Sequence, residues 1–192
     1  MTDQAVLDFL ATRRSHSPKV LTAPVPTRDQ LESLLDLAAR SPDHGALAPW
    51  RFIVVEKPAM ARLADLAEKR ARALGRDADD IVKARGQFDR GNLAVVVVES
   101  PVVSEKVPPR EQTLSAGAVC LSLVNAALAS VWGAGWVTGW VSFDRGFVEQ
   151  GLVLGLGADE EVAGIVHIGS YASAPVERQR PDVKGITTWQ SA

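Results

Sequence analysis

The chain has 192 residues, of which 46% are hydrophobic and 23% are charged, and its formal net charge is -2. This balance is typical of a folded globular protein and excludes a chain that is disordered throughout. A net charge so close to zero gives no general attraction to phosphate backbones or anionic lipid, so we expect neither nucleic acid nor a membrane as a partner.

Cysteine and histidine are scarce. The single cysteine, Cys120, excludes an internal disulfide, and with only three histidines a Cys/His zinc site is not expected. The N-terminus MTDQAVLDFLATRR carries acidic Asp3 and Asp8 and no basic start followed by an apolar run, so we predict no secretion signal. These features favour a cytoplasmic protein.

The chain begins with two predicted helices. Thr2 or Asp3 can cap the first helix, whose apolar positions have helical spacing and which ends near RRSHSP, residues 13–18. Thr27 and Gln30 form a capping box for the second helix, DQLESLLDLAAR, which carries Leu31, Leu34, Leu35 and Ala38 on one face.

A loop of unusual composition, RSPDHGALAPW, follows the second helix. Pro42 and Pro49 stiffen it, and Gly45 leaves room for a ligand to approach the backbone. His44 could bind a ligand, titrate or cap backbone groups. A stiff loop of small residues beside a strand end suits a ligand contact, and the next segment, RFIVVE, is a β-branched strand.

Two helices and a strand come next. Pro58 suits the first turn of a helix over residues 59–74, and DADDIVKARGQFD, residues 77–89, predicts another helix. The run NLAVVVVES, residues 92–100, is continuously apolar between turn signals. That pattern is expected of a central strand covered on both faces.

The segment from Gln112 to Phe143 contains no charged residue and is long enough to span a membrane. It also contains Ser and Asn, is rich in Gly and Ala, and lacks flanking Lys/Arg clusters. We therefore predict a helix that is apolar all round and is buried as the spine of a domain or of a dimer.

The remaining elements are a short strand GWVTG (135–139), a helix RGFVEQGLVLG (145–155) and a strand VAGIVHIGS (162–170). The polar, proline-containing tail, about 171–192, could wrap a partner or be disordered.

The glycines between Gly151 and Gly157 follow a predicted helix and precede a strand, which is the reverse of a dinucleotide fingerprint. We interpret them as a helix C-cap and turn. The order of elements predicts a layered α+β or α/β fold, with residues 1–192 as a single domain.

The segment RRSHS, from Arg13 to Ser17, groups two guanidinium groups with two hydroxyls. Arginine presents a planar fork of donors that suits phosphate, and serine hydroxyls can complete such a shell. The same cations would also favour the C-terminal dipole of the preceding helix. On local sequence the two interpretations are equally supported.

Other reactive residues point to structural roles. Cys120 lies in the uncharged run, where thiolate formation is disfavoured. His167 has apolar neighbours, so we expect it to be packed and hydrogen-bonded. Glu160 and Glu161 lie in a polar loop and are expected to be solvated. The serines show no nucleophile-elbow pattern, so a hydrolase triad has no support.

Four segments occur in one order along the chain: RRSHS, ARSPDHGALAPWRFIVV, EKVPPREQTLSAGAVCLSLVNAALASVWGAGWVTG and VAGIVHIGSYASAP. Together they resemble the FMN-dependent nitroreductase family, in its short NAD(P)H nitroreductase-like branch. The resemblance extends from about Val6 to Pro175, and the joint pattern is more specific than any single segment.

The resemblance implies an α+β fold with a central, mostly antiparallel sheet flanked by helices. It also implies a homodimer with FMN at two sites formed across the subunit interface, so that the uncharged helix belongs to the dimer core. The residues that it assigns to FMN binding are Arg13, Arg14, Ser15, Arg40, His44, Trp136, Val137 and Thr138.

Two positions depart from the family pattern. Ser17 stands where many members have Lys or Arg, and Val137 stands where close relatives have Arg. Both changes remove a cation near a negative ligand. Arg13, Arg14 and Arg40 are then left to supply most of the positive charge.

The chemistry that the resemblance implies takes place at FMN N5 and needs no catalytic side chain. NAD(P)H, the co-substrate, would give up a hydride, and a nitroaromatic, quinone or similar small molecule would then take its place, in a ping-pong mechanism. Arg13 or Arg14 beside the ring would favour its reduced form. The alternatives are a flavin-binding carrier or sensor without turnover, and a dimeric interaction protein that has lost FMN.

Overall fold

The computed structural model describes residues 2–152 and 155–191. The elements in chain order are α1 (Gln4–Thr12), the 3-10 turn η1 (Pro18–Val20), α2 (Arg28–Ala38), β1 (Trp50–Glu56), α3 (Lys57–Ala73), α4 (Ala78–Asp89), β2 (Leu93–Glu99), α5 (Pro109–Ala129), β3 (Gly133–Val137), α6 (Trp140–Phe143), α7 (Arg145–Phe147), the π-helical turn η2 (Val148–Leu152) and β4 (Glu161–Gly169).

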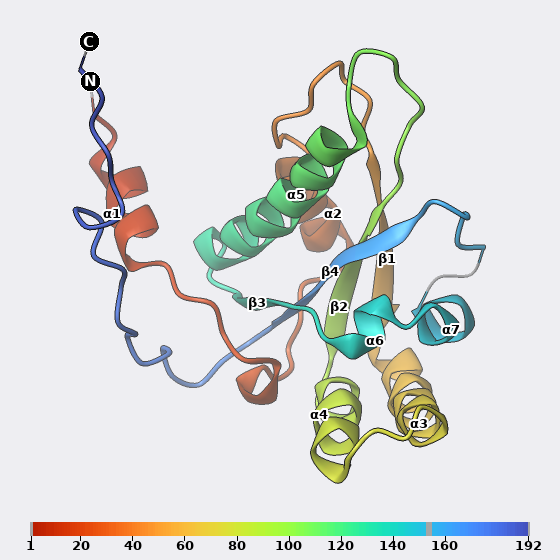
Figure 1. Cartoon of the computed structure of the whole chain (residues 1–192). Coiled ribbons are helices and arrows are strands. Elements are labelled where there is room, and N and C mark those ends of the chain that lie inside the picture. Colours follow the sequence, from red (N-terminus) through yellow and green to blue (C-terminus); the bar gives the residue numbers. More distant parts are fainter. Residues whose placement is uncertain (1, 153–154, 192) are drawn as a thin grey trace.

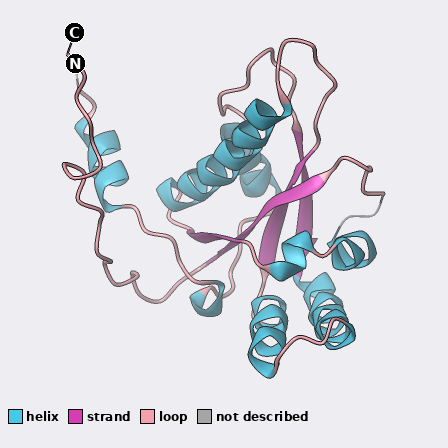
Figure 2. Cartoon of the chain, in the orientation of Figure 1, coloured by secondary structure: helices cyan, strands magenta, loops and turns pink. Residues whose placement is uncertain are grey.

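The four strands form one sheet in the order β1-β2-β4-β3, and every neighbouring pair is antiparallel. Helices α2 and α5 cover one face of this sheet, while α3, α4 and the short helices α6 and α7 lie towards the other (Figures 1 and 2). The prediction of an α+β fold with an antiparallel sheet between helices is confirmed.

The central strand β2 separates two hydrophobic clusters. Val96 and Val98 point into the cluster built with α3 and α4, whereas Val95 and Val97 point into the cluster built with α2 and α5. All four valines are fully buried. This confirms the prediction of a strand covered on both faces, since alternate side chains of a strand point to opposite sides.

Helix starts follow the predicted caps. The Gln30 backbone N–H donates to Thr27 Oγ1 at 3.3 Å, and the Thr27 backbone N–H donates to Gln30 Oε1 at 2.9 Å, which completes the capping box. Asp3 caps α1 by accepting from the Val6 N–H, and Pro58 lies in the first turn of α3. Local chemistry therefore sets these boundaries.

Helix α5 has the length and apolar composition of a membrane span. Its packing is that of a core helix, because Val119, Cys120 and Leu123 are fully buried against α2 and the sheet. The opposite side exposes Leu114 and Leu121. Within this chain the predicted buried spine is thus one-sided, and an apolar stripe is left at the surface.

Two predicted elements differ from the structure. Strand β3 begins at Gly133 and ends at Val137, so Thr138 follows the strand instead of lying in it. The helix predicted over 145–155 is the short α7 followed by the wide turn η2, and its residues 153–154 lie outside the described residues. Gly155 has φ +75° and lies in a turn, as predicted for the glycine-rich segment.

The N-terminal arm, which consists of α1 and the RRSHS segment that follows it, runs beside the C-terminal tail at the left of Figure 1. None of the nine residues of α1, all of which are described, is buried, and Val6, Leu7 and Leu10 are exposed. The Arg14 guanidinium donates to the Val176 carbonyl at 3.1 Å. The arm therefore rests on the tail without a hydrophobic core of its own.

Glu160 is not solvated as expected. Its two oxygens accept from Nε and Nη2 of Arg51, both at 2.6 Å, and it also accepts from the Ser100 hydroxyl. The bidentate Arg51 contact lowers the pKa of Glu160 to about 2. The expectation was wrong because Arg51 lies on β1, far away in sequence but next to the start of β4 in space.

His167 is buried on β4, opposite Ala94 of β2 and Gly135 of β3. The expected hydrogen bonds are not made, since neither ring nitrogen has a partner among the described residues. Burial lowers the pKa of His167 to about 4, so the ring is neutral and packs as an apolar side chain.

The buried His167 should make the fold acid-sensitive. Because its folded pKa lies below the unfolded value of about 6.5, the unfolded chain takes up a proton first, and stability falls as the pH drops from about 6.5 towards 4. We expect the free energy of unfolding to fall by roughly 3 kcal/mol across this window on account of His167. His167→Leu should keep stability at pH 7 and flatten this part of a urea-denaturation pH profile; an unchanged slope would contradict the assignment.

Candidate functional site

The segment RRSHS is docked on the outer edge of β3. The His16 backbone N–H donates to the Ala134 carbonyl at 2.8 Å. Next to it, a Cβ on Gly135 would lie only 2.1 Å from the His16 carbonyl oxygen, so only glycine permits this approach. The sheet thereby fixes the position of Arg13, Arg14 and Ser15 instead of leaving them on a free helix end.

The two arginines of this segment keep unused donors. Arg13 Nη2 donates to Ser15 Oγ at 3.1 Å, and Arg14 Nη2 donates to the tail at Val176. The Nε atoms of both arginines are buried and have no hydrogen-bond partner among the described residues. A buried charged donor without an acceptor is costly, so the site is suited to an anion.

The electrostatics of Arg13 support the same conclusion. Its pKa is lowered by burial and by the neighbouring positive charges of Arg180 and Arg14. Glu177 offers partial compensation, at 3.9 Å from Arg14 Nε and 2.8 Å from Arg180 Nη2. Three guanidinium groups thus converge with one exposed carboxylate, which leaves net positive charge.

A cavity of about 320 Å³ lies at this cluster, between the arm, the C-terminal end of α5 and the tail. Arg13, Arg14, His16 and Leu128 are among the residues that line it. Tyr171 closes one side, with its ring centroid 4.2 Å from that of His16. The cavity offers cations next to apolar and aromatic surface.

Trp136 lies flat against the sheet on the side covered by α5. A Cβ on Gly164 of β4 would come within 1.9 Å of Trp136 Nε1, so the missing side chain at 164 makes room for the indole. The ring is 41% exposed and offers an aromatic surface near the docked RRSHS segment. Val137 packs against the cluster on the opposite face, and the exposed Thr138 follows it.

The loop with Arg40 and His44 is attached to another part of α5. Ser41 Oγ lies 2.8 Å from Ser122 Oγ, and His44 Nδ1 lies 2.7 Å from Glu111 Oε2. Arg40 and His44 are both exposed. The loop is therefore fixed in place while it presents a cation and an imidazole to the surface.

The backbone of this loop is held in a demanding shape. Gly45, Ala46 and Ala48 all have positive φ, and the Asp43 carboxylate accepts from the Ala48 N–H at 2.7 Å. Non-glycine residues rarely adopt such angles unless their surroundings impose them. The hydrogen bond to Asp43 therefore adds a contact that holds this loop, besides the two prolines.

One chain brings only part of the predicted site together. His44 contacts Glu111 near the start of α5, whereas the Arg13 cavity borders Leu128 near its end. Leu128 lies 17 positions after Glu111 in α5, which corresponds to roughly 25 Å along the helix axis. The RRSHS segment and Trp136 are neighbours around β3, but His44 is remote from both.

The sequence-based prediction missed Arg180. This residue lies in the tail, whose path has no local signature, and its position beside Arg13 depends on contacts between the two ends of the chain. The one available signal was the alternation of basic residues at Arg178 and Arg180 in an otherwise polar tail.

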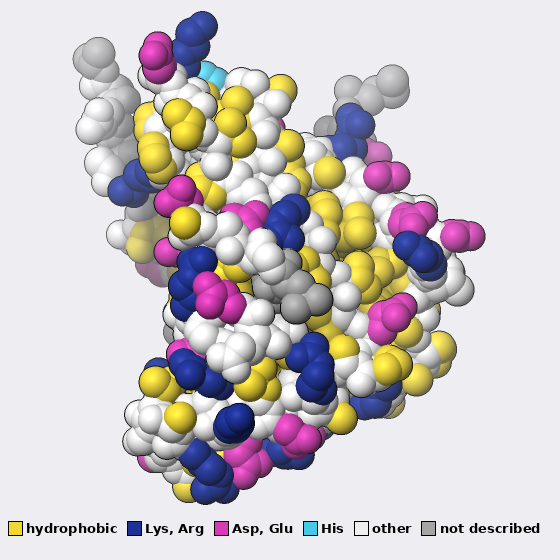
Figure 3. Space-filling model, turned by 90° about the vertical axis from the view of Figure 1, so that its right-hand side faces the viewer, with side chains coloured by type: hydrophobic (Ala, Val, Ile, Leu, Met, Phe, Trp, Pro, Cys, Tyr) yellow, Lys and Arg dark blue, Asp and Glu magenta, His cyan; other side chains and the backbone are white. Residues whose placement is uncertain are grey.

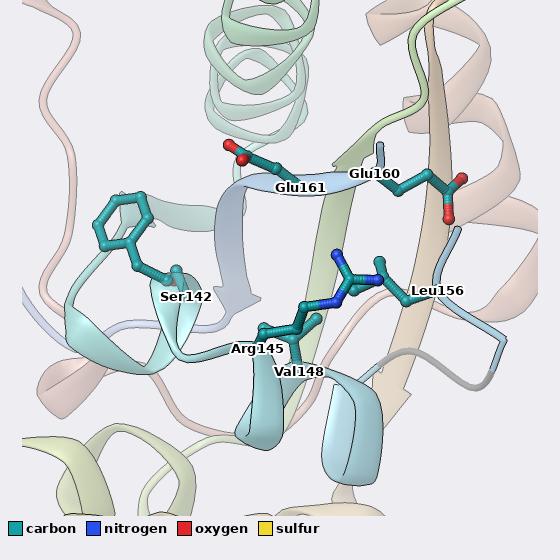
Figure 4. Close-up of a pocket in the computed structure, with 7 residues that line it drawn as sticks. Ser142, Arg145, Val148, Leu156, Glu160 and Glu161 are labelled. Atoms are coloured by element: carbon teal, nitrogen blue, oxygen red, sulfur yellow. The ribbon is translucent and has the colours of Figure 1, made fainter. Parts of the chain in front are cut away.

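Other cavities among the described residues lie apart from this cluster. One of about 140 Å³ lies between α7 and the start of β4, where Arg145 extends towards the loop of Leu156 (Figure 4). The guanidinium group of Arg145 already has partners within the chain, since it donates to Glu149 at 2.6 Å and to the Gly157 carbonyl at 2.9 Å.

Another cavity, about 720 Å³, lies between α2 and β1 and is lined by apolar residues such as Leu35 and Phe52 and by charged residues such as Arg28 and Glu56. Hydrophobic side chains are also prominent on the side of the molecule shown in Figure 3. Because β1 and β3 are opposite edges of the sheet, this cavity is not part of the Arg13–Trp136 cluster.

Nucleophilic chemistry by the one cysteine is not supported. Cys120 is fully buried in α5, and burial raises the pKa of its thiol to about 12. A thiol in that state is not a nucleophile at neutral pH. This agrees with the expectation that Cys120 belongs to the core.

Comparison with known proteins identifies relatives over most of the chain. The model of the nitroreductase family matches residues 10–170. A protein of Escherichia coli (strain K12) named "Putative NAD(P)H nitroreductase YdjA" is 33% identical over 164 residues, which is 85% of this chain and 87% of that protein.

Solved structures share the fold. The nitroreductase-like family protein from Bacillus cereus superposes with a TM-score of 0.81 at 20% identity, over 100% of this chain and 99% of the other. A nitroreductase with bound FMN from Bacteroides fragilis gives a TM-score of 0.72 at 20% identity, over 98% of this chain and 100% of the other.

The docking of RRSHS on β3 can be tested at Gly135. Gly135→Ala places a methyl group against the His16 carbonyl, so the segment should detach while the rest of the fold persists. We expect trypsin to cleave after Arg13 or Arg14 about five- to tenfold faster, with unchanged far-UV circular dichroism. Gly86→Ala in α4, where the nearest atom would be 4.0 Å away, is the matched control. Equal cleavage rates in the two variants would show that the segment does not depend on Gly135.

Proposed function

The chain belongs to the nitroreductase family, and on that premise we propose that it is an FMN-dependent oxidoreductase that uses NAD(P)H to reduce an electron-poor small molecule. The acceptor class is a nitroaromatic, quinone or similar compound. The observation that carries this proposal is the cluster of Arg13, Arg14 and Ser15 on the edge of β3, which offers unused charged donors beside the exposed Trp136.

The residues of the cluster fit FMN. A phosphate accepts several charge-assisted hydrogen bonds, which would satisfy the orphaned Nε atoms of Arg13 and Arg14 and offset the burial and the charge repulsion that lower the pKa of Arg13. We assign Arg180 to the same phosphate group. Trp136 supplies an aromatic surface of the kind that lies along a flavin ring.

FMN, when bound, would supply the redox chemistry that carries a hydride from NAD(P)H to the acceptor, and we propose a ping-pong order for the two substrates. The chain's own residues contribute binding and orientation. The RRSHS segment would hold the negative end of the cofactor, and we assign Trp136 and Thr138 to its ring. We propose that no acid, base or nucleophile from the protein is required.

Ser17 and Val137 depart from the family pattern by lacking a cation, so FMN binding would depend more on these arginines. Ser17 uses its hydroxyl locally, accepting from the Lys19 N–H at the start of η1. Val137 packs against the apolar cluster on the other face of the sheet. Neither replaces the missing cation, so Arg13, Arg14 and Arg40, together with Arg180, are the assigned sources of positive charge.

We also propose that the protein works as a homodimer. Arg40 and His44 can share a site with Arg13 only across two copies, because His44 and Arg13 lie at opposite ends of α5. A twofold axis crossing α5 would pair its apolar stripe, Leu114 and Leu121, and bring the start of one α5 to the end of the other.

The tail supports the same assembly. Val176, Ile186 and Trp189 are each at least 73% exposed, which is unusual for apolar side chains on a segment that packs on its own subunit. We assign them to contacts that wrap the partner, and we place the protein in the cytoplasm, where its lone thiol stays reduced.

Anaerobic reduction tests the function directly. The purified protein should be yellow or take up FMN. When NADH or NADPH is added without oxygen, the absorbance of the bound flavin should fall to a level close to that of free reduced FMN. An acceptor such as a nitroaromatic or quinone should then restore the colour. Bound flavin that neither nicotinamide bleaches would instead support a carrier or sensor, and a chain that takes up no FMN would refute the proposal.

Subunit mixing tests the shared site. Arg13→Ala and Arg40→Ala should each loosen FMN, by about 1.5 to 3 kcal/mol where a charged hydrogen bond is lost. If the two residues come from different copies, co-refolding the two variants creates mixed dimers with one intact site, so about a quarter of all sites should regain wild-type FMN affinity. Recovery is measured by fluorescence titration of FMN, and no recovery would place both residues in a site within one chain or outside the site.

A further inference from the structure

A hollow of about 390 Å³ lies on the face of the sheet covered by α3 and α4, where the β3–α6 turn meets α4. The charged residues that line it are Arg76, Lys83 and Asp80, and Gln87, Thr138 and Trp140 also line it. Thr138 follows Val137 at the end of β3, so the hollow begins where the proposed flavin site ends.

Two hydrogen-bond donors at this hollow have no acceptor. Gln87 Nε2 and Trp140 Nε1 are both buried and make no hydrogen bond to any described residue. Buried polar groups in native proteins are almost always paired, so two orphaned donors on side chains that line one hollow point to a ligand that supplies acceptors.

The charges at the hollow favour a negative ligand. Lys83 forms no ion pair within the described part of the chain. Arg76 is shared between Asp80, whose Oδ2 lies 3.1 Å from its Nη1, and the face of Trp140, whose ring centroid lies 4.7 Å from its Cζ. One cation is therefore neutralised and the other is free, beside an aromatic wall.

We propose that this hollow binds the acidic end of the acceptor, and that the preferred acceptors are aromatic compounds carrying a carboxylate or similar anionic group. The assignment rests on the proposed function, because Thr138 would link the anion in the hollow to the reducible group at the flavin. The carboxylate accepts from Lys83, Gln87 Nε2 and Trp140 Nε1, and the aromatic ring extends past Thr138 towards the edge of the sheet at the end of β3.

The test compares 4-nitrobenzoate with 4-nitrobenzamide, a neutral compound of nearly the same shape. Equilibrium dialysis against the FMN-loaded protein and the FMN-free protein measures binding, and NADH-driven reduction measures kcat/KM. We expect about tenfold tighter binding of 4-nitrobenzoate and a correspondingly higher kcat/KM. Equal binding of the two compounds would overturn the proposal.

Variants test whether the preference for the acid arises in the hollow. Lys83→Gln should bring the ratio of the 4-nitrobenzoate affinity to the 4-nitrobenzamide affinity, the acid-to-amide ratio, close to one. Lys69→Gln, an equal charge change at an exposed position of α3, should preserve this ratio. Gln87→Leu should lower the ratio without lowering the melting temperature, since it removes an orphaned donor. A ratio unchanged by both Lys83→Gln and Gln87→Leu would overturn the proposal even if the wild type prefers the acid.

The two proposals fail in different ways. A protein whose flavin is not bleached by either nicotinamide refutes the oxidoreductase, and dialysis of 4-nitrobenzoate still decides whether the hollow binds an anion. If the acid binds with the expected preference but is not reduced by a protein that does reduce 4-nitrobenzamide, the hollow is not an acceptor site and the inference is wrong.

Discussion

The packing of α5 across the sheet is the constraint on which the rest of the molecule depends. Its buried side, with Val119 and Leu123, fills the cluster between α2 and the strands. Its polar side chains serve as attachment points for the loop after α2, through Ser122 and Glu111. Because the helix is rigid over its 21 residues, it also sets the distance between the two groups of candidate site residues.

The sheet adds a second constraint at β3, which is an edge strand made largely of small residues. Gly135 allows the backbone of RRSHS to approach, and Gly164 on β4 allows the Trp136 indole to lie flat. Adding one methyl group at either position would disturb the cluster. The absence of side chains, as much as the presence of arginines, therefore shapes the site.

Local features of the fold could be predicted from the sequence, and long-range ones could not. The capping box of α2 and the buried strand β2 depend on neighbouring residues, and both were predicted correctly. The pairing of Glu160 with Arg51 and the approach of Arg180 to Arg13 depend on chain paths that no local pattern encodes. The orphaned ring of His167 escaped prediction for a different reason, since propensity does not report whether a buried donor finds a partner.

Helix α1 has a thermodynamic consequence for the whole molecule. Its nine residues are too few for a helix to persist alone in water, and none of them is buried against the sheet. If partner contacts order it, dilution should loosen this arm while the clusters around β2 stay intact. Amide hydrogen exchange in residues 4–12 would then vary with protein concentration, and exchange in β2 would not.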